Sequence, residues 1–385
     1  KKTMEITGNP FIVSGSIQPE YFCDRREESA RLIKSVTSGN NLLLLSPRRM
    51  GKTGLIQFCY GKKKLSGYHR FFIDILHTTG LKEFTYLLGK EVFNKLLSAD
   101  RRMPGLLIRT LKSISGKLGF DPVSGLPVFS LELGDIDRPE YTLEEIFTCL
   151  QEAGKPCIVA IDAFQQIAKY PERDIEALLH SNIQRTSNAR FILAGSERHL
   201  MQEMFTSSAR PFYQSADLLE LGPIDRSIYL DFVTGHFRRR GRDIEPDTVG
   251  KVYDMFEGNT YCMQKTLNES FADTAKGRTC TPGTTDNAVR GIISSFSPTY
   301  REILSNIPEK QKELLYSIAI DRKAESITSS AFIRRHSLAS ASSVQSASRK
   351  LLEKGLVTTN NGIWSISDMF FGMWIRSIYE KYSNN

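Results

Sequence analysis

Short apolar runs alternate with longer stretches of helical periodicity in the first part of the chain. Near-continuous runs, typical of strands covered on both faces, lie at 41–45, 157–162 and 191–195. Two weaker candidate strands lie at 70–76 and 218–221. Helical stretches such as "LKEFTYLLGKEVFNKLLSADRR" and "PERDIEALLHSNIQR" separate these strands. This alternation predicts an α/β fold with a parallel sheet and right-handed crossovers.

The pattern changes twice further along the chain. Residues 226–300 lose the strand signal and read as three helices, each followed by a glycine typical of a helix C-terminus. Residues 301–385 read as three helices followed by two short strands around "NNG", a hairpin signal. Three helices and a hairpin are the plan of a winged helix. We therefore expect a core at 1–225, with an insertion at 103–140, a helical lid at 226–300 and a winged helix at 301–385.

Composition narrows the class of protein. The chain has 385 residues, of which 40% are hydrophobic and 24% charged, as in soluble globular proteins. No apolar run reaches the roughly 18 residues of a membrane span, and the first residues do not form a secretory signal. The six cysteines are scattered without a CxxC pair, which indicates reduced thiols. We expect a cytoplasmic protein without a membrane partner; the net charge of +8 allows a polyanionic partner.

A phosphate-binding loop follows the first predicted strand. Eight residues match the P-loop pattern G-x-x-x-x-G-K-[ST] except at the first position: Ser46, Pro47, Arg48, Arg49, Met50, Gly51, Lys52 and Thr53. The strand before the loop and the helical pattern after it are the context that the motif requires. A chance GKT tripeptide in a turn would lack both.

The residue types in this loop suit Mg·ATP. Backbone N–H groups and a helix N-terminus form the cradle, and Gly51 permits close approach of the phosphates. Lys52 would reach the β- and γ-phosphates, and the Thr53 hydroxyl would bind Mg²⁺. Gly54 is a further candidate nucleotide contact, whereas Arg48 and Arg49 could face solvent or a neighbouring subunit.

The strand "CIVAID" ends in a second metal-site candidate, Asp162. In P-loop ATPases with an additional strand between the two motifs, the next residue is usually a Glu that activates water. This chain has Ala163, whose methyl group cannot accept a proton. The protein is then either a natural nucleotide-binding switch with little hydrolysis, or a copy in which Glu was replaced to trap ATP. The likeness of "AIDAFQQI" to "IDEFQQI" favours the second interpretation.

Two further catalytic candidates follow the next strand. Ser196 could touch the γ-phosphate or position water, although a residue there can equally cap a helix. Arg210 could neutralise charge on the transferred phosphoryl group at a neighbouring subunit's site. Arg198 and Arg185 are rivals for that role, and a surface salt bridge is an equally good reading of each.

Several segments together resemble the archaeal-type AAA+ ATPases, which lie near the STAND group of P-loop ATPases. The segments are "NPFIVSG…PEYFCDRREE", "SPRRMGKT", "IDAFQQI", "FILAGSERHLM…F" and "WSISDMFFGMWIR". The resemblance covers nearly the whole chain and implies an AAA+ core, a helical lid and a C-terminal winged helix. It also implies that Pro10, Phe11 and the segment from Phe22 to Arg25 border the adenine. The lid segment 258–264 contains no arginine, so it departs from the family's pattern of a cation in the lid.

The winged helix has two possible partners. Residues 301–385 carry 12 Lys and Arg against 8 Asp and Glu. Third-helix side chains that could reach phosphates or bases are Ser340, Ser342, Ser343, Gln345, Arg349 and Lys350. Duplex DNA is one possible partner; a docked protein is the other, because winged helices of such ATPases often bind proteins. The leading hypothesis is an AAA+ ATPase whose Mg·ATP state moves the lid and the winged helix, with a second copy of the chain as a further candidate partner in a homo-oligomer. The alternatives are an ATP-licensed DNA-binding regulator or loader and a signalling or defence switch.

Overall fold

A computed structural model of the chain describes residues 8–15, 17–99, 105, 109–113, 118–120, 127–129 and 131–383. The chain divides into two compact units. One is Ser16–Gly222, and the other combines Lys1–Gly15 with Pro223–Asn385.

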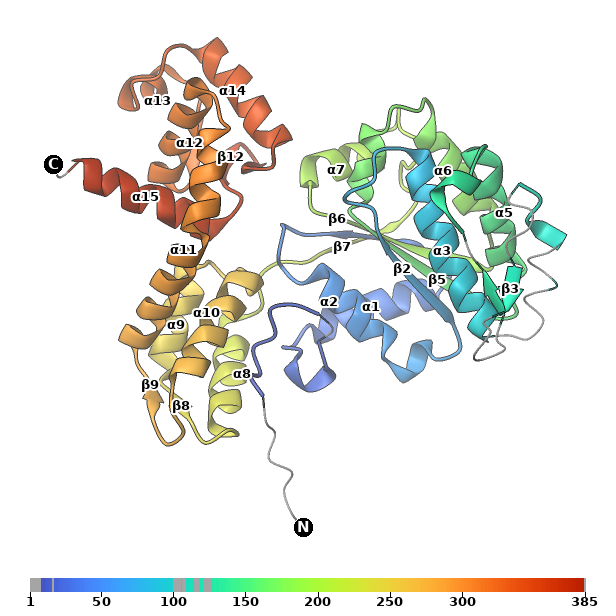
Figure 1. The fold of residues 1–385 in the computed structure, drawn as a ribbon, viewed down its shortest axis with the longest axis horizontal. Coiled ribbons are helices and arrows are strands. Elements are labelled where there is room, and N and C mark those ends of the chain that lie inside the picture. Colours follow the sequence, from blue (N-terminus) through green and yellow to red (C-terminus); the bar gives the residue numbers. More distant parts are fainter. Residues whose placement is uncertain are drawn as a thin grey trace. The chain divides into compact units, whose positions relative to one another are not determined.

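The first unit is built on a five-stranded parallel sheet (Figure 1). Its strands are β1 (Leu42–Leu45), β2 (His69–Asp74), β5 (Cys157–Asp162), β6 (Ala189–Gly195) and β7 (Asp217–Glu220). Their order is β2-β5-β6-β1-β7, and every neighbouring pair is parallel. All five predicted strands and the predicted parallel sheet are confirmed. Strand β6 lies between β1 and β5, which is the arrangement of P-loop ATPases with an additional strand between their two motifs.

Both faces of the sheet are buried, as the continuous apolar runs predict. In β1, Leu42 and Leu44 belong to a core shared with α1 (Arg26–Thr37) and α2 (Lys52–Tyr60). Leu43 and Leu45 belong to the opposite core, which four other helices cover. These helices are α3 (Leu81–Ala99), α5 (Pro139–Gln151), α6 (Ile175–Arg185) and α7 (Arg198–Thr206). Figure 1 shows α1 and α2 on one side of the sheet and α3, α5 and α6 on the other.

Short elements connect this framework. They are η1 (Pro19–Tyr21), η2 (Lys63–Leu65), η3 (Leu133–Asp135) and η4 (Phe164–Lys169). The predicted insertion at 103–140 lies in large part outside the described residues. Its described parts include β3 (Leu118–Phe120) and β4 (Pro127–Phe129), which pair antiparallel.

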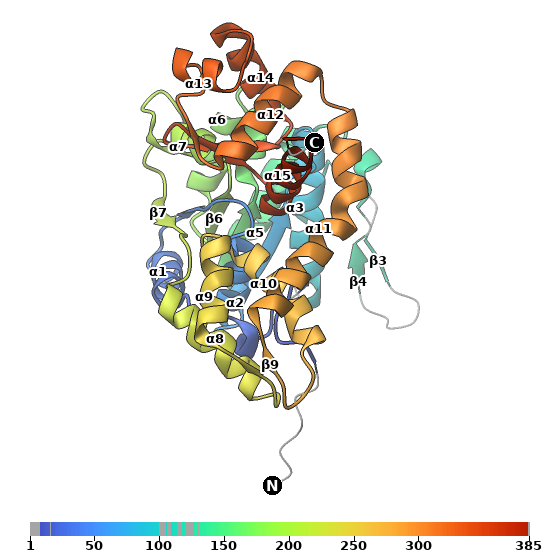
Figure 2. The same ribbon diagram turned by 90° about the vertical axis from the view of Figure 1, so that its left-hand side faces the viewer.

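The helical part of the second unit contains the three predicted helices. They are α8 (Arg226–Arg238), α9 (Pro246–Met255) and α10 (Thr260–Asp273), and α11 (Pro282–Ser305) follows. The glycine expected after each of the three has a positive φ, 68° at Gly241, 72° at Gly258 and 76° at Gly277. A two-residue parallel pair, β8 (Asp243–Ile244) with β9 (Thr279–Cys280), was not predicted. Helix α11, prominent in Figure 2, runs without interruption across residues 300 and 301.

The C-terminal part of this unit is a winged helix. Its helices are α12 (Glu309–Asp321), α13 (Ser330–Arg335), α14 (Ala341–Glu353) and α15 (Met369–Ser383). The predicted hairpin consists of β11 (Val357–Asn360) and β12 (Ile363–Ile366). The two loop residues, Asn361 and Gly362, have φ of 50° and 80°, as a tight hairpin turn requires. A third strand that was not predicted, β10 (Ala324–Glu325), pairs with β12.

The aromatic residues of α15 pack into the interior. Phe370, Phe371 and Trp374 are buried, and the Trp374 indole donates a hydrogen bond to the Ser297 hydroxyl at 3.0 Å. Helix α15 is therefore part of the core of this unit. The six cysteines are all buried free thiols. None of the helices within the described ranges is long and apolar enough to span a bilayer.

Candidate functional site

The P-loop joins the end of β1 to the start of α2. Arg49 and Gly51 both have left-handed backbone, with φ of 66° and 93°. Glycine adopts this conformation without a steric cost, whereas Arg49 adopts it with some strain. Ser46, which replaces the first glycine of the motif, is not among the residues with positive φ. Its side chain is therefore compatible with the loop. Helix α2 begins without a side-chain cap, which leaves its first N–H groups available to phosphate oxygens.

Lys52 is buried at the base of this loop. Its side chain is folded back so that Nζ lies 3.4 Å from both the carbonyl oxygen and the hydroxyl of Ser46. Burial lowers the pKa of Lys52 and nearby Arg48 lowers it further, whereas Asp162 acts in the opposite direction. A poorly hydrated ammonium group of this kind interacts strongly with an incoming polyanion, because it has little water to lose.

Thr53 and Asp162 meet across the sheet edge. The Thr53 hydroxyl donates a hydrogen bond of 2.6 Å to Oδ2 of Asp162, and the backbone N–H of Ala163 donates to Oδ1 at 2.9 Å. A hydroxyl and a carboxylate are the hard oxygen donors that Mg²⁺ prefers. No group of three or more His, Cys, Asp or Glu that could hold a metal occurs in the described part of the chain. The pair fits a Mg²⁺ that takes its other ligands from phosphates and water.

Ala163 occupies the position after this carboxylate in an uncommon backbone conformation. It has φ of 59° and only 8% of it is exposed. Its methyl group offers no proton acceptor at the place where the motif ordinarily carries Glu. The backbone turns sharply here, from the end of β5 into η4.

Ser196 lies directly after β6, whose last residue, Gly195, is in register with Leu45 of β1. The N-cap of the following helix α7 is Glu197, so Ser196 does not hold that position. The Glu197 carboxylate instead forms an ion pair of 2.7 Å with Lys169.

Each candidate trans-acting arginine is paired within its own chain. Arg210 donates to Glu176 at 3.0 Å and to Glu203 at 2.9 Å. The rivals are held similarly: Arg198 contacts Glu220 at 2.8 Å, and Arg185 lies 3.9 Å from Glu144. For any of them to reach a neighbouring subunit, these ion pairs would have to open.

The residues expected around the adenine fall into different parts of the structure. Phe22 stacks on Phe58 of α2 with centroids 4.0 Å apart, beside Gly54. A Cβ at Gly54 would lie 3.8 Å from the Phe22 ring and 3.3 Å from Ile17, so the glycine allows this close packing. Pro10 and Phe11 are buried in the other unit, where the Phe11 ring packs against Phe237 and Phe271.

Arg25, which the resemblance implied at the border of the adenine, makes a structural contact with the P-loop that was not predicted. It is 4% exposed and has φ of 61°. Its guanidinium donates to Glu28 at 2.9 Å, to the Met50 carbonyl at 3.4 Å and to the Gly222 carbonyl at 2.7 Å. It therefore links the P-loop to the last residue of the first unit. The segment "FCDRREESAR" contains three arginines, and nothing in its pattern indicates that Arg25 is the one that contacts the P-loop.

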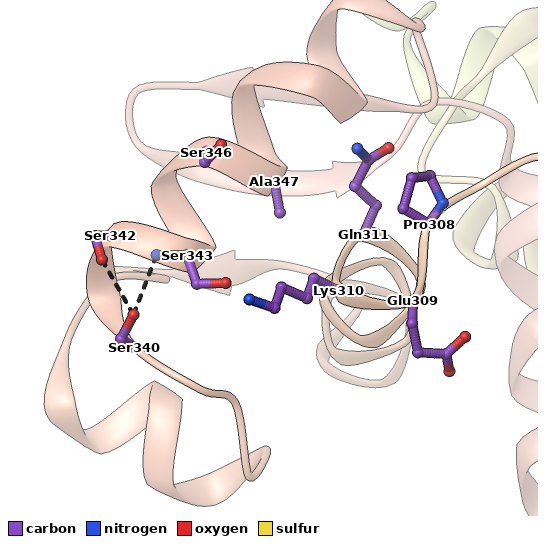
Figure 3. Close-up of a pocket in the computed structure, with 9 residues that line it drawn as sticks. All are labelled: Pro308, Glu309, Lys310, Gln311, Ser340, Ser342, Ser343, Ser346 and Ala347. Carbon is purple, nitrogen blue, oxygen red and sulfur yellow. Dashed lines mark hydrogen bonds between the residues drawn. The ribbon is translucent and has the colours of Figure 1, made fainter.

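The winged helix has a separate polar groove of about 550 Å³ between the starts of α12 and α14 (Figure 3). Lys310 points across it toward Ser343, as Figure 3 shows. Ser340 caps α14 by accepting a hydrogen bond from the Ser343 backbone at 3.3 Å, so part of the predicted serine cluster has a structural role. Arg349 and Lys350 are exposed, and Lys350 forms an ion pair of 2.8 Å with Glu353.

Comparisons with known proteins agree with this architecture. The Walker-type ATPase of Pyrococcus abyssi is 18% identical, with a TM-score of 0.63 over 95% of this chain and 99% of its own. Orc2 of Aeropyrum pernix, solved in ADPNP–ADP complexes, is 14% identical, with a TM-score of 0.56 over 98% of each chain. Orc1 of Aeropyrum pernix, solved with DNA, is 13% identical, with a TM-score of 0.53 over 95% of each chain. At such identities these structures show the fold alone.

Matches to family models assign the chain to a family, which the distantly related structures do not. No curated protein matches the chain. A model of a probable winged helix domain matches residues 298–377, and a model of an ATPase domain predominantly from Archaea matches residues 22–265, more than half of the chain. The chain therefore belongs to the family of ATPase domains found predominantly in Archaea, here followed by a winged helix.

Proposed function

We propose that the chain binds Mg·ATP at the P-loop and that its nucleotide state controls the positions of the helical segment and the winged helix. Backbone N–H groups of residues 48–53 and the Lys52 ammonium would hold the triphosphate, with Thr53 and Asp162 directed to the metal. Mg²⁺, when bound, would neutralise charge on the β- and γ-phosphate oxygens.

One observation carries this proposal. The Thr53 hydroxyl lies 2.6 Å from the Asp162 carboxylate, although the two residues are 109 positions apart in the sequence. Thr53 lies in the first turn of α2, which follows β1, whereas Asp162 ends β5, and β6 separates these two strands. This places the end of the P-loop and the end of the acidic strand within the reach of a single small cation. A chance GKT tripeptide would have no reason to meet a carboxylate there.

Ala163 limits what this chain can do with the bound nucleotide. ATP hydrolysis requires removal of a proton from the attacking water, and a positioned base contributes about 10²–10⁴ to such rates. The other carboxylate named near this edge, Glu197, is engaged by Lys169 at 2.7 Å. We therefore propose that the chain holds ATP but hydrolyses it poorly, and that a Glu at 163 would support turnover.

Calorimetric titration with Mg·ATP tests the proposal directly. Lys52→Ala should weaken binding by about 100-fold, because it removes a buried charge-assisted contact to the phosphates. Lys64→Ala is the matched control, since Lys64 is an exposed lysine beyond the end of α2. Equal affinity of the Lys52 variant and the parent chain would refute the P-loop assignment.

A second candidate function is ATP-licensed binding of duplex DNA. The winged-helix match and the positive balance of residues 301–385 favour it. Orc1 of Aeropyrum pernix, which shares the fold at low identity, was solved with DNA. Affinity for a DNA duplex should then fall steeply with salt, because bound phosphates release counterions. No binding at low salt, with or without ATP, would exclude this function.

A third candidate is a nucleotide-dependent switch that recruits a protein partner or a second copy of the chain. The exposed polar face of α14 is equally suited to a protein surface. Light scattering with ADP and with ATP would detect assembly, and a monomer in both states would exclude the homo-oligomer.

A further inference from the structure

The structure contains a buried polar side chain beside the nucleotide site that the P-loop motifs do not use. Gln165 lies in η4, three residues after Asp162, and is 0% exposed. Neither its amide nitrogen nor its oxygen has a hydrogen-bond partner among the described residues. Such groups are rare in native proteins, because a buried unpaired amide loses its hydration without compensation. Their occurrence near a reaction site calls for a functional explanation.

The neighbouring glutamine provides the contrast. Gln166 donates a hydrogen bond to the Thr78 carbonyl at 3.0 Å, so it ties η4 to the loop after β2. The two adjacent glutamines of η4 thus differ in whether their side-chain amides form hydrogen bonds. Gln166 is satisfied in this structure, whereas Gln165 holds two unused hydrogen-bonding groups inside the protein.

The Gln165 amide is packed against the end of β6. A Cβ built on Gly195 would lie 2.8 Å from the Gln165 oxygen and 2.6 Å from Cγ of Met201. Only a glycine lets the amide approach the backbone so closely. Beyond this contact the chain forms the turn 195–197, which carries Ser196 and leads into α7.

The same backbone is connected to the P-loop. The Gly195 carbonyl accepts a hydrogen bond of 3.3 Å from the Ser46 N–H, and Lys52 Nζ lies 3.4 Å from the Ser46 carbonyl. A short chain of contacts therefore runs from the phosphate-binding lysine through Ser46 and Gly195 to the Gln165 amide. If binding of a γ-phosphate moves this turn, the contacts between Gly195 and the Gln165 amide change as well.

We infer that Gln165 is a positioning residue that distinguishes the triphosphate from the diphosphate state. In the triphosphate state the turn 195–197 shifts so that its peptide groups pair with the Gln165 amide, which fixes Ser196 against the γ-phosphate. In the diphosphate state the amide remains unpaired. The inference rests on the proposed binding of ATP at the P-loop and adds a residue that acts on the nucleotide through the backbone.

Replacement of Gln165 by methionine tests this inference, because methionine keeps the length and removes both polar groups. Calorimetry would give the affinities of the full chain for Mg·ADPNP and Mg·ADP. Gln165→Met should reduce the preference for ADPNP over ADP by about tenfold, the worth of one or two hydrogen bonds. The ligand-free variant should melt about 2–4 °C higher, since an unpaired buried amide has been removed. Gln166→Met, the matched control, should melt lower and keep the preference.

The outcomes separate the inference from the proposed function. If the parent chain binds neither nucleotide, the proposed function fails. If the parent binds both and Gln165→Met keeps the parent's preference, the inference is overturned; a lower melting temperature of that ligand-free variant overturns it too, because the amide would already be satisfied. If Gln165→Met does not fold, hydrogen exchange on the parent chain decides. Slower exchange of residues 195–201 with ADPNP than with ADP supports the inference, and equal exchange contradicts it.

Discussion

The starts of α2 and α14 are the two places where we considered binding of a polyanion, and the side chains around them differ. At the start of α2, Lys52 is buried against Ser46, and the Thr53 hydroxyl meets Asp162. At the start of α14, Ser340 is occupied as a cap, and the basic residues Arg349 and Lys350 lie more than two turns further along the helix. The first site converges from two strands, whereas the second is a polar surface on one small domain.

The difference shows which groups, besides the helix N-terminus itself, indicate a ligand site. The dipole is common to both helices, but the Ser340 hydroxyl occupies one of the first N–H groups of α14, whereas α2 has no side-chain cap. Only at the start of α2 do a buried cation and a carboxylate from a distant segment lie nearby. Burial of these charges costs free energy of folding, which a bound ligand of opposite charge could offset. The contacts at the start of α2 therefore support the proposed nucleotide site, whereas those at the start of α14 do not by themselves indicate a ligand.

The largest expected effect concerns position 163. Ala163→Glu should raise ATP turnover by about 10²–10⁴, because it supplies the base for the attacking water. Phosphate release measured under saturating Mg·ATP checks this, with Ala163→Gln as a control of similar size that cannot take the proton. Unchanged turnover in the Glu variant would mean that the core is a switch and that its specialisation ends at binding.

The pH dependence of ATP binding sharpens the contrast at Lys52. Burial lowers the pKa of Lys52 in the free protein, and bound phosphates would raise it again. Between these two pKa values binding takes up one proton, so affinity should fall by about tenfold per pH unit as the pH rises through this window. Calorimetry in two buffers of different ionisation enthalpy measures the uptake. Lys52→Ala should abolish it, and uptake that persists in this variant would assign the proton to another group.

Arg210 tests whether the core needs a neighbouring subunit. Burial raises the pKa of Glu176, and its ion pair with Arg210 opposes that rise. Arg210→Ala should therefore lower the free energy of unfolding by about 1–2 kcal/mol at neutral pH. The loss should shrink as the pH falls through the raised pKa, because protonated Glu176 no longer needs a counter-ion.

Chemical denaturation at pH 7 and pH 5 measures this loss. Arg173→Ala, an exposed arginine without an ion pair among the described residues, is the control. Unchanged stability together with lost turnover in an Ala163→Glu background would assign Arg210 to a neighbour's site instead.

Much of the fold could be predicted from the sequence because its signals are local. Continuous apolar runs identify strands covered on both faces, and "NNG" identifies a two-residue turn. The pairs β8–β9 and β10–β12 escaped prediction because two residues carry no periodicity. The continuous helix α11 also escaped prediction, and it crosses the boundary that we expected between residues 300 and 301.

The site was predictable only where its residues form motifs. Lys52, Thr53 and Asp162 could be proposed from the sequence, since a loop and two buried strands fix their type and spacing. The contacts of Arg25 and Gln165 could not, because they come from packing: Arg25 bonds to the Met50 and Gly222 carbonyls, and Gln165 lies against Gly195. Such contacts depend on backbone positions that no local pattern encodes.

The smallest expected effect concerns the winged helix, where single charges should matter little. Arg349 is exposed and has no ion pair among the described residues, whereas its neighbour Lys350 is paired with Glu353. If α14 contacts duplex DNA, Arg349→Ala should weaken binding a few-fold and reduce the slope of log affinity against log salt by about one. Lys350→Ala should change the slope less, since its charge is already partly neutralised. Fluorescence anisotropy with a labelled duplex over a salt series measures both. Equal slopes in the parent chain and both variants would place any DNA contact away from this face, and would leave α14 as a surface for a protein partner.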